Sequence, residues 1–287
     1  MWPGTTTGVV ALLGDPVAHS LSPDIHNAGF RALELDLVYL ACRVAPARLA
    51  DAIGGLHALG ALGANVTVPH KVAAAALVDE LTPEASAIGA VNTLVRNDVG
   101  WLGANTDVAG FLAALGPRRA GLRGEHVVIL GAGGVARAAS YALLTDVEPA
   151  RLTIAARRVD QADAVAAAAH TWATGATIDT RDLASAASAV NGAALIVNAT
   201  TIGMPPGVGE TPLADPETLH PGQLVFDLVY APAPTRLGRE AMARGADTID
   251  GSEMLVNQAA ASFKLWTGRD LPLGVVRAVA RPATEAA

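Results

Sequence analysis

An apolar run, Val-Val-Ile-Leu at residues 127–130, leads directly into Gly-Ala-Gly-Gly-Val-Ala at 131–136 and then into an alanine-rich segment. The run is typical of a buried strand, and the segment after it of a helix. Gly131 permits a tight turn, Gly133 lets the backbone approach a pyrophosphate, and Ala136 allows close helix–strand packing. The helix N-terminus offers free N–H groups to the phosphates. This stretch therefore predicts the dinucleotide-binding turn of a doubly wound parallel sheet.

The next predicted strand indicates which dinucleotide is bound. It runs from Leu152 to Ala156 and ends in Arg157 and Arg158, with the nearest acid, Asp160, beyond the pair. An NAD site offers a carboxylate here to the ribose hydroxyls, whereas arginine can hold a 2′-phosphate bidentately. We therefore expect NADP as the cofactor. The alternative is that both arginines are only exposed charges at a strand end.

A second stretch, Asn-Val-Thr-Val-Pro-His-Lys at residues 65–71, suggests where chemistry takes place. Its β-branched residues favour a short strand, which Pro69 stops, so that Lys71 follows a strand end. A lysine beside an aspartate can transfer a proton at an oxygen undergoing redox change, and Asp107 is the candidate partner. Taken alone, Lys71 is more simply explained as a solvated residue at the start of a helix.

Composition excludes several classes of protein. A chain of 287 residues suggests two domains, and a formal net charge of −7 argues against nucleic acid or an anionic membrane as partner. The single cysteine, Cys42, excludes an internal disulfide and suits a reducing cytosol. We find no basic signal-peptide start, no apolar run of membrane-spanning length and no histidine spacing typical of a metal site. We therefore expect a soluble, cytoplasmic protein without a metal.

Strands and helices alternate along the chain, as is typical of parallel α/β sheets. Strands are predicted at residues 8–13, 38–44, 65–68, 89–95 and near 127, 152, 194 and 224. Helices are predicted from Pro23, at 46–59, 72–79 and 107–115, and at 253–267. A hairpin-like turn is expected at residues 97–100, and Ser22 is placed as the N-cap of the first helix.

Eight motifs occur in order along the chain, at residues 14–23, 65–71, 89–93, 105–107, 131–134, 198–203, 227–230 and 251–258. Together they identify the sequence as a member of the shikimate dehydrogenase family, over nearly its whole length. The resemblance implies a two-domain α/β fold and the NADPH-dependent reduction of 3-dehydroshikimate to shikimate in aromatic amino acid biosynthesis. It further implies a substrate domain at residues 1–106, a Rossmann-type NADP domain at 107–249, and C-terminal helices at 250–287 that pack on the substrate domain.

The resemblance also implies roles for individual residues. Lys71 and Asp107 match the catalytic pair, and Ser20 and Ser22 match the serines that bind the substrate carboxylate. The remaining substrate contacts are Asn65, Thr67, Asn92, Tyr230 and Gln258. The cofactor contacts are Gly131, Ala132, Gly133, Gly134, Val135, Arg157, Arg158, Thr200, Thr201, Gly203, Leu228 and Gly251. Ala156 and Arg158 replace the small polar residues of the family pattern, which leaves the strength of the NADP preference open.

Two alternatives are compatible with the same motifs. One is a quinate/shikimate dehydrogenase with relaxed cofactor use; Ser22 and the absence of an acid beside the ribose argue against it, because quinate-using relatives tend to carry threonine and an acid there. The other is a non-catalytic paralogue that senses a nucleotide or metabolite, against which the intact Lys71 and Asp107 argue. A monomer and a homodimer are both compatible with the sequence.

Overall fold

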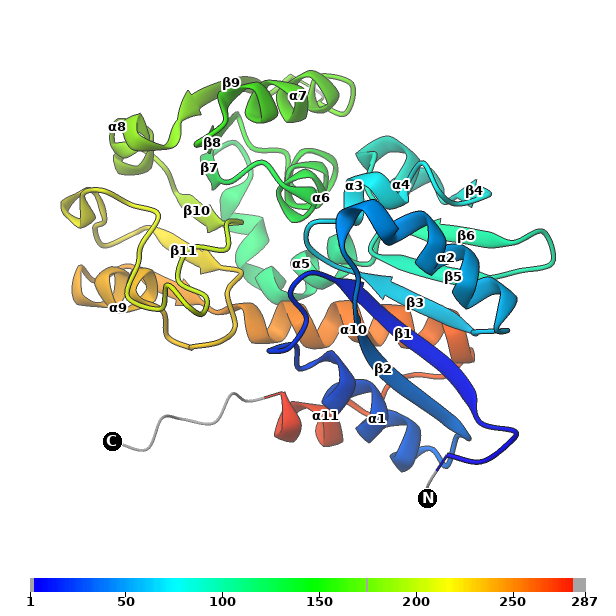
Figure 1. The fold of residues 1–287 in the computed structure, drawn as a ribbon. Helices are drawn as coiled ribbons and strands as arrows, with labels where there is room; N and C mark the ends of the chain where they lie inside the picture. The colour runs from blue at the N-terminus through cyan, green and yellow to red at the C-terminus, as the bar shows by residue number, and fades with distance from the viewer. Residues whose placement is uncertain (1–2, 174, 281–287) are drawn as a thin grey trace. The chain divides into compact units, whose positions relative to one another are not determined.

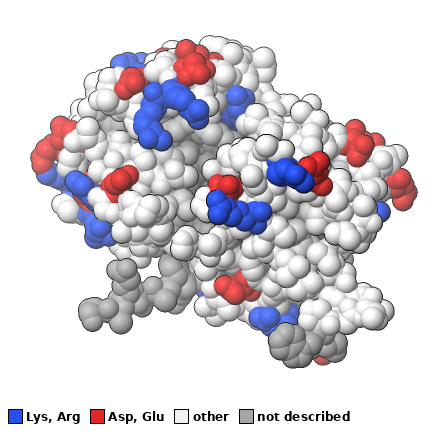
Figure 2. Space-filling model, in the orientation of Figure 1, with Lys and Arg blue, Asp and Glu red and all other residues white. Residues whose placement is uncertain are grey.

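The computed structural model describes residues 3–173 and 175–280 (Figure 1). These residues form two compact units: residues up to 110 together with those from 255 onward, and residues 111–254. On the face drawn in Figure 2, acidic and basic side chains are interspersed. Within the described part of the chain, no helix combines the length and the apolar character that crossing a membrane requires.

The first unit contains a mixed six-stranded sheet. Its strands are β1 (Gly8–Gly14), β2 (Leu37–Arg43), β3 (Gly63–Val66), β4 (Glu80–Leu81), β5 (Thr93–Arg96) and β6 (Trp101–Ala104), in the order β2-β1-β3-β5-β6-β4. β1 pairs in parallel with β2 and β3, whereas β5 is antiparallel to β3 and β6. The antiparallel pair follows from the predicted turn at residues 97–100, because a parallel crossover needs a dozen or more residues. The alternation of strands and helices by itself favours parallel strands and does not predict this antiparallel pair; the turn does.

Helices cover both faces of this sheet. They are α1 (Ser22–Ala32), α2 (Leu49–Ala58), α3 (Lys71–Ala74), α4 (Pro83–Ile88), most of α10 (Gly251–Thr267) and α11 (Leu273–Val279). Val10 and Leu12 of β1 lie in a core cluster with α1, α10 and α11, while Ala11 and Leu13 lie in a cluster with α2. The alternation follows the two-residue period of a strand. The predicted helix at 72–79 was too long and the predicted strand at 89–95 began too early.

A histidine is buried in the core of the first unit. The His26 side chain is 0% exposed, and its ring stacks on Tyr39 with the centroids 4.5 Å apart. Neither ring nitrogen has a hydrogen-bond partner among the described residues. Burial lowers the pKa of His26 from its ordinary value of 6.5 to about 3.

This burial predicts acid sensitivity. Below about pH 6.5 the unfolded chain binds a proton at His26 that the folded chain excludes, so stability falls as pH falls towards 3. Between about pH 7.5 and about pH 5 we expect His26 to remove about 2 kcal/mol of unfolding free energy. His26→Phe keeps an aromatic ring but cannot titrate, and urea unfolding of this variant should lack that loss. An equal loss in both proteins would assign the acid sensitivity to other groups.

The second unit contains a six-stranded sheet in which every pairing is parallel. Its strands are β7 (His126–Leu130), β8 (Arg151–Ala156), β9 (Thr177–Asp182), β10 (Leu195–Asn198), β11 (Leu224–Asp227) and β12 (Asp247–Ile249), in the order β12-β11-β10-β7-β8-β9. This is the doubly wound order, which reverses between β7 and β10. The predicted fold class is confirmed.

Helices also pack on this second sheet. They include α5 (Asp107–Leu115), which starts in the first unit, and α6 (Gly134–Ala142), α7 (Val159–Ala169), α8 (Ala187–Asn191) and α9 (Arg236–Ala243). Val128 and Val225 lie in a core cluster with Ala189 of α8 and Leu237 of α9. Phe226, which neighbours Val225 in the strand, stacks on Phe111 of α5, with ring centroids 5.1 Å apart. The sheet is therefore buried by apolar side chains on both faces.

Candidate active site

Lys71 and Asp107 meet in the first unit. Lys71 is the first residue of α3, and the turn before it is held by a bond from the His70 N–H to the Thr67 carbonyl at 2.9 Å. Lys71 Nζ lies 2.6 Å from Asp107 Oδ2, with the side chains only 14% and 5% exposed. The partnership expected from the sequence is therefore present in the structure. A mostly buried ion pair is screened little by solvent, so each charge strongly orients the other.

Asn92 fixes the other oxygen of the Asp107 carboxylate. Its Nδ2 donates to Asp107 Oδ1 at 2.9 Å and to Thr106 Oγ1 at 3.0 Å, while its Oδ1 accepts the Thr106 N–H at 2.8 Å. Both amide hydrogens of Asn92 are therefore used within the protein, and the side chain is 2% exposed. Asn92, a predicted substrate contact, therefore uses its side chain within the protein to orient the Asp107 carboxylate.

Asn65 is held in a similar way by a buried hydroxyl network. Its Oδ1 accepts from the Tyr39 hydroxyl at 2.8 Å, and its Nδ2 donates to Thr93 Oγ1 at 3.1 Å and to Ser262 Oγ at 3.0 Å. Sequence reasoning missed Tyr39, Thr93 and Ser262. The available signal was the spacing of Ser262, which lies one helical turn after Gln258 on α10.

The two serines differ from the sequence expectation. α1 begins at Ser22 itself with Leu21 as N-cap, and Ser20 Oγ accepts the Ser22 N–H at 3.2 Å. The prediction of Ser22 as N-cap was therefore wrong, because Ser20, two residues earlier, supplies the acceptor in a turn that serine favours. The Ser22 hydroxyl makes no hydrogen bond to the described residues, although the side chain is 6% exposed.

The other predicted substrate contacts are partly exposed. Thr67 lies in the turn between β3 and α3, and Gln258 lies on α10, where its Nε2 donates to the Leu255 carbonyl at 3.1 Å. Tyr230 is also partly exposed and belongs to the second unit, three residues beyond the end of β11.

The glycine-rich turn lies between β7 and α6 in the second unit. Gly131 has φ +113° and faces the Ala199 carbonyl, which a Cβ would approach to 2.8 Å, so only glycine fits. Gly133 is exposed, and a Cβ there would meet nothing within 4 Å. The N-terminus of α6 at Gly134 has no side-chain cap. This open space in front of free N–H groups fits a pyrophosphate.

Arg157 and Arg158 directly follow β8. Both side chains are exposed, and neither forms an ion pair with the described residues. An exposed arginine pair at this strand end is compatible with the 2′-phosphate contact that the sequence predicts.

Two further loops follow β10 and β11 at the same edge of the sheet. The β10 loop contains Thr200, Thr201 and Gly203, and Gly203 has φ +99°. Leu228 follows β11, and its carbonyl lies so close to Gly251 that a Cβ there would clash. Because the strands are parallel, these loops meet the glycine-rich turn at the carboxyl edge, where doubly wound sheets bind nucleotides.

A doubly wound sheet with this turn, joined to an α/β unit that holds a buried lysine–aspartate pair, defines a two-domain dinucleotide-binding protein of the dehydrogenase class. Two family models match the sequence: the shikimate dehydrogenase substrate binding domain at residues 12–94, and the shikimate 5′-dehydrogenase C-terminal domain at residues 251–281. A curated NADP(+) shikimate dehydrogenase of Salinibacter ruber is 48% identical, over 94% of this chain and 96% of its own. The chain belongs to the shikimate dehydrogenase family.

Solved structures support the same assignment. A shikimate dehydrogenase in complex with NADP+ is 37% identical, with a TM-score of 0.87 and 96% of each chain covered. One from Thermus thermophilus, in complex with NADP(H) and shikimate, is 34% identical, with a TM-score of 0.82, covering 95% of this chain and 98% of its own. The family predicted from the eight motifs is confirmed.

Proposed function

We propose that this chain is an NADP-dependent oxidoreductase that interconverts 3-dehydroshikimate and shikimate in aromatic amino acid biosynthesis, with Lys71 and Asp107 as its proton-transfer pair. The observation that carries the proposal is the 2.6 Å contact between Lys71 Nζ and Asp107 Oδ2, mostly buried, in the unit that carries the family's substrate-domain motifs. In this proposal the first unit supplies the proton-transfer pair and most of the substrate contacts, and the second unit binds NADP, in the cytoplasm.

The proposed chemistry follows from the charges at this pair. Bound NADPH supplies a hydride, which leaves negative charge on the oxygen of the substrate ketone. The Lys71 ammonium stabilises that oxygen and donates a proton to it. Asp107 aims the ammonium through Oδ2, and Asn92 fixes the carboxylate through Oδ1. In the reverse direction Lys71 accepts the proton of the substrate hydroxyl.

Recognition of the substrate is assigned to hydroxyl and amide side chains of the family motifs. Ser20 and Ser22 donate to the carboxylate of the substrate, because a hydroxyl can do so without adding charge. Thr67, Tyr230 and Gln258 bind the ring hydroxyls. Asn65 and Asn92, whose amides form hydrogen bonds within the protein, are assigned to the wall of the site.

NADP is assigned to the second unit. The loop from Gly131 through Ala132, Gly133 and Gly134 to Val135 holds the pyrophosphate, and Arg157 and Arg158 hold the 2′-phosphate. Thr200, Thr201, Gly203, Leu228 and Gly251 line the nicotinamide side. The open space at Gly133 and the unpaired arginines support this assignment.

Purified protein tests the proposal directly. Oxidation of shikimate with NADP, followed by NADPH absorbance, should proceed at about one turnover per second or faster. Faster turnover of quinate with NAD would favour the quinate/shikimate alternative. Binding of NADP without turnover of either compound would favour a sensor and overturn the proposed activity.

The serine pair gives a further prediction. Ser22→Ala should raise the Michaelis constant for shikimate with little loss of stability, because its hydroxyl bonds to no described residue. Ser20→Ala should raise the Michaelis constant and also lower the unfolding free energy by about 0.5–2 kcal/mol, since it removes the acceptor of the Ser22 N–H. Although Ser20 lies outside the helix, its replacement is therefore expected to affect stability as well as binding. Steady-state kinetics and thermal melts decide, and unchanged Michaelis constants in both variants would contradict the carboxylate assignment.

A further inference from the structure

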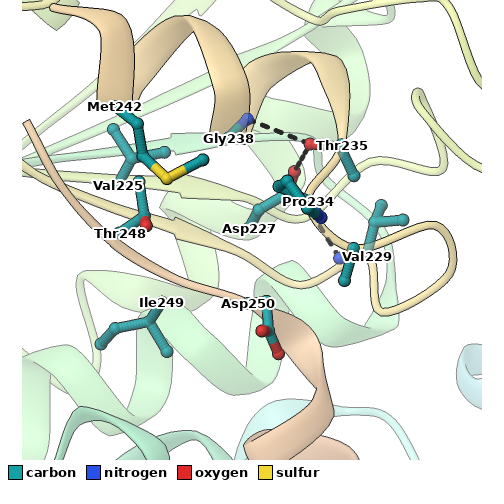
Figure 3. A pocket seen from close by; sticks show the side chains of 11 residues that line it. Val225, Asp227, Val229, Pro234, Thr235, Gly238, Met242, Thr248, Ile249 and Asp250 are labelled. Atoms are coloured by element: carbon teal, nitrogen blue, oxygen red, sulfur yellow. Dashed lines mark hydrogen bonds between the residues drawn. The ribbon is translucent and has the colours of Figure 1, made fainter. Parts of the chain in front are cut away.

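A buried acid in the second unit has no part in the assignments above. Asp227 ends β11, is 4% exposed and accepts three hydrogen bonds, of which Figure 3 draws those from Val229 and Thr235. Its Oδ1 accepts from Asn198 Nδ2 at 2.9 Å and from the Val229 N–H at 3.1 Å, and its Oδ2 accepts from the Thr235 hydroxyl. One carboxylate therefore joins the neighbouring strand, the segment after its own strand and the start of α9.

Asn198 extends this connection into the loop after β10. Asn198 and Asp227 are register partners, and Asn198 Oδ1 accepts from the Thr200 N–H at 3.1 Å and from Thr200 Oγ1 at 2.7 Å. Thr200 Oγ1 in turn accepts the Ile202 N–H at 3.0 Å, and the Asn198 carbonyl accepts the Leu228 N–H at 3.1 Å. The two loops after β10 and β11 are thus fixed to one another through Asp227 and Asn198.

Burial of the Asp227 carboxylate costs folding free energy at this position. None of the described lysines or arginines forms an ion pair with Asp227, and burial raises its pKa. Asp250, a second acid, lines the same cavity of about 250 Å³. A buried acid without a cation destabilises a fold unless its hydrogen bonds are complete. Thr235 caps α9 through the Gly238 N–H by itself, so the helix does not require the acid.

We infer that Asp227 is a positioning residue for the cofactor: it holds residues 199–203 and 228–229 in the geometry that accepts the nicotinamide half of NADP. The inference rests on the proposed function, because that function assigns Thr200, Thr201, Gly203 and Leu228 to the nicotinamide. Asp227 touches none of the reacting groups and acts only through these backbone segments.

Ligand binding separates this role from a general structural one. NADPH contains both halves of the cofactor, whereas adenosine 2′,5′-bisphosphate contains only the half assigned to the glycine-rich turn and Arg157. Asp227→Ala should raise the dissociation constant of NADPH about tenfold or more, with that of the bisphosphate unchanged within about twofold, as expected for lost positioning of one half only. A merely destabilised second unit would weaken both ligands together.

Two variants control for packing and stability. Thr235→Val removes the α9 cap and one bond to Asp227 but leaves the bonds to Asn198 and Val229. It should lower the melting temperature and change NADPH binding by less than about twofold. Asp227→Asn keeps a carbonyl oxygen for Asn198 and Val229, and its amide can donate to the Thr235 hydroxyl. NADPH binding should therefore be largely restored.

Results that overturn the role of Asp227 differ from results that overturn the proposed function. Unchanged NADPH binding in Asp227→Ala, or equal weakening of NADPH and the bisphosphate, overturns the inference while the proposed function stands. Wild-type protein that binds no NADPH counts against the proposed function itself. Should Asp227→Ala fail to fold, Asn198→Ala cuts the same connection from β10 and carries the same expectation for both ligands, and unchanged NADPH binding there overturns the inference.

Discussion

Lys71→Ala is expected to lower the turnover of shikimate about a hundredfold or more, while its Michaelis constant stays within about twofold. The physical reason is that the ammonium stabilises charge that exists only after hydride transfer begins. Its removal therefore raises the barrier more than it weakens the bound ground state. Steady-state kinetics with NADP, in both directions of the reaction, measure the two constants separately.

The chain supplies its own matched control for this experiment. It contains only one other lysine, Lys264, whose Nζ lies 2.8 Å from Asp270 Oδ1 in an exposed ion pair. Lys264→Ala should leave both kinetic constants unchanged, because exposed ion pairs contribute little. A loss of turnover of less than about tenfold in Lys71→Ala, with a raised Michaelis constant, would make Lys71 a binding residue and the proposed mechanism wrong.

The proton-transfer chemistry of Lys71 and Asp107 could be predicted from the sequence, but the hydrogen-bond network that surrounds the site could not. Lys71 and Asp107 lie in short motifs whose residue types suggest proton transfer. Tyr39, Thr93 and Ser262, by contrast, are ordinary residues of two strands and a helix. They become a network only because β2, β5 and α10 bring their hydroxyls to Asn65. Local pattern contains no information on such long-range contacts.

The same limit explains which strands were missed. β7 and β10 are buried runs of apolar residues and were found, whereas β9, Thr-Ile-Asp-Thr-Arg-Asp, carries three charges. β9 and β12 are the two edges of their sheet, and edge strands tolerate polar residues that interior strands exclude. Apolar periodicity therefore finds the centre of a parallel sheet and overlooks its borders.

Cofactor preference gives the second large effect. Replacing Arg157 and Arg158 together with glutamine should weaken NADP about a hundredfold while changing NAD by no more than about threefold. Only NADP carries the phosphate that the arginines are proposed to hold, and each lost charged hydrogen bond costs about 1.5–3 kcal/mol, or tenfold or more. Dissociation constants of both cofactors, measured by fluorescence titration, test this directly.

Arg118 and Arg119 provide the control, because they are a second adjacent pair of exposed arginines in the same unit. Their replacement by glutamine changes the net charge equally and should leave both cofactors unaffected. Equal weakening of NADP and NAD binding by the Arg157 and Arg158 change would instead show that this pair stabilises the fold and does not bind the phosphate.

Single variants then resolve the departure from the family pattern: if Arg158 replaces the lost polar contact, Arg158→Gln alone should weaken NADP about tenfold. If Arg157 holds the phosphate alone, only Arg157→Gln should have that effect.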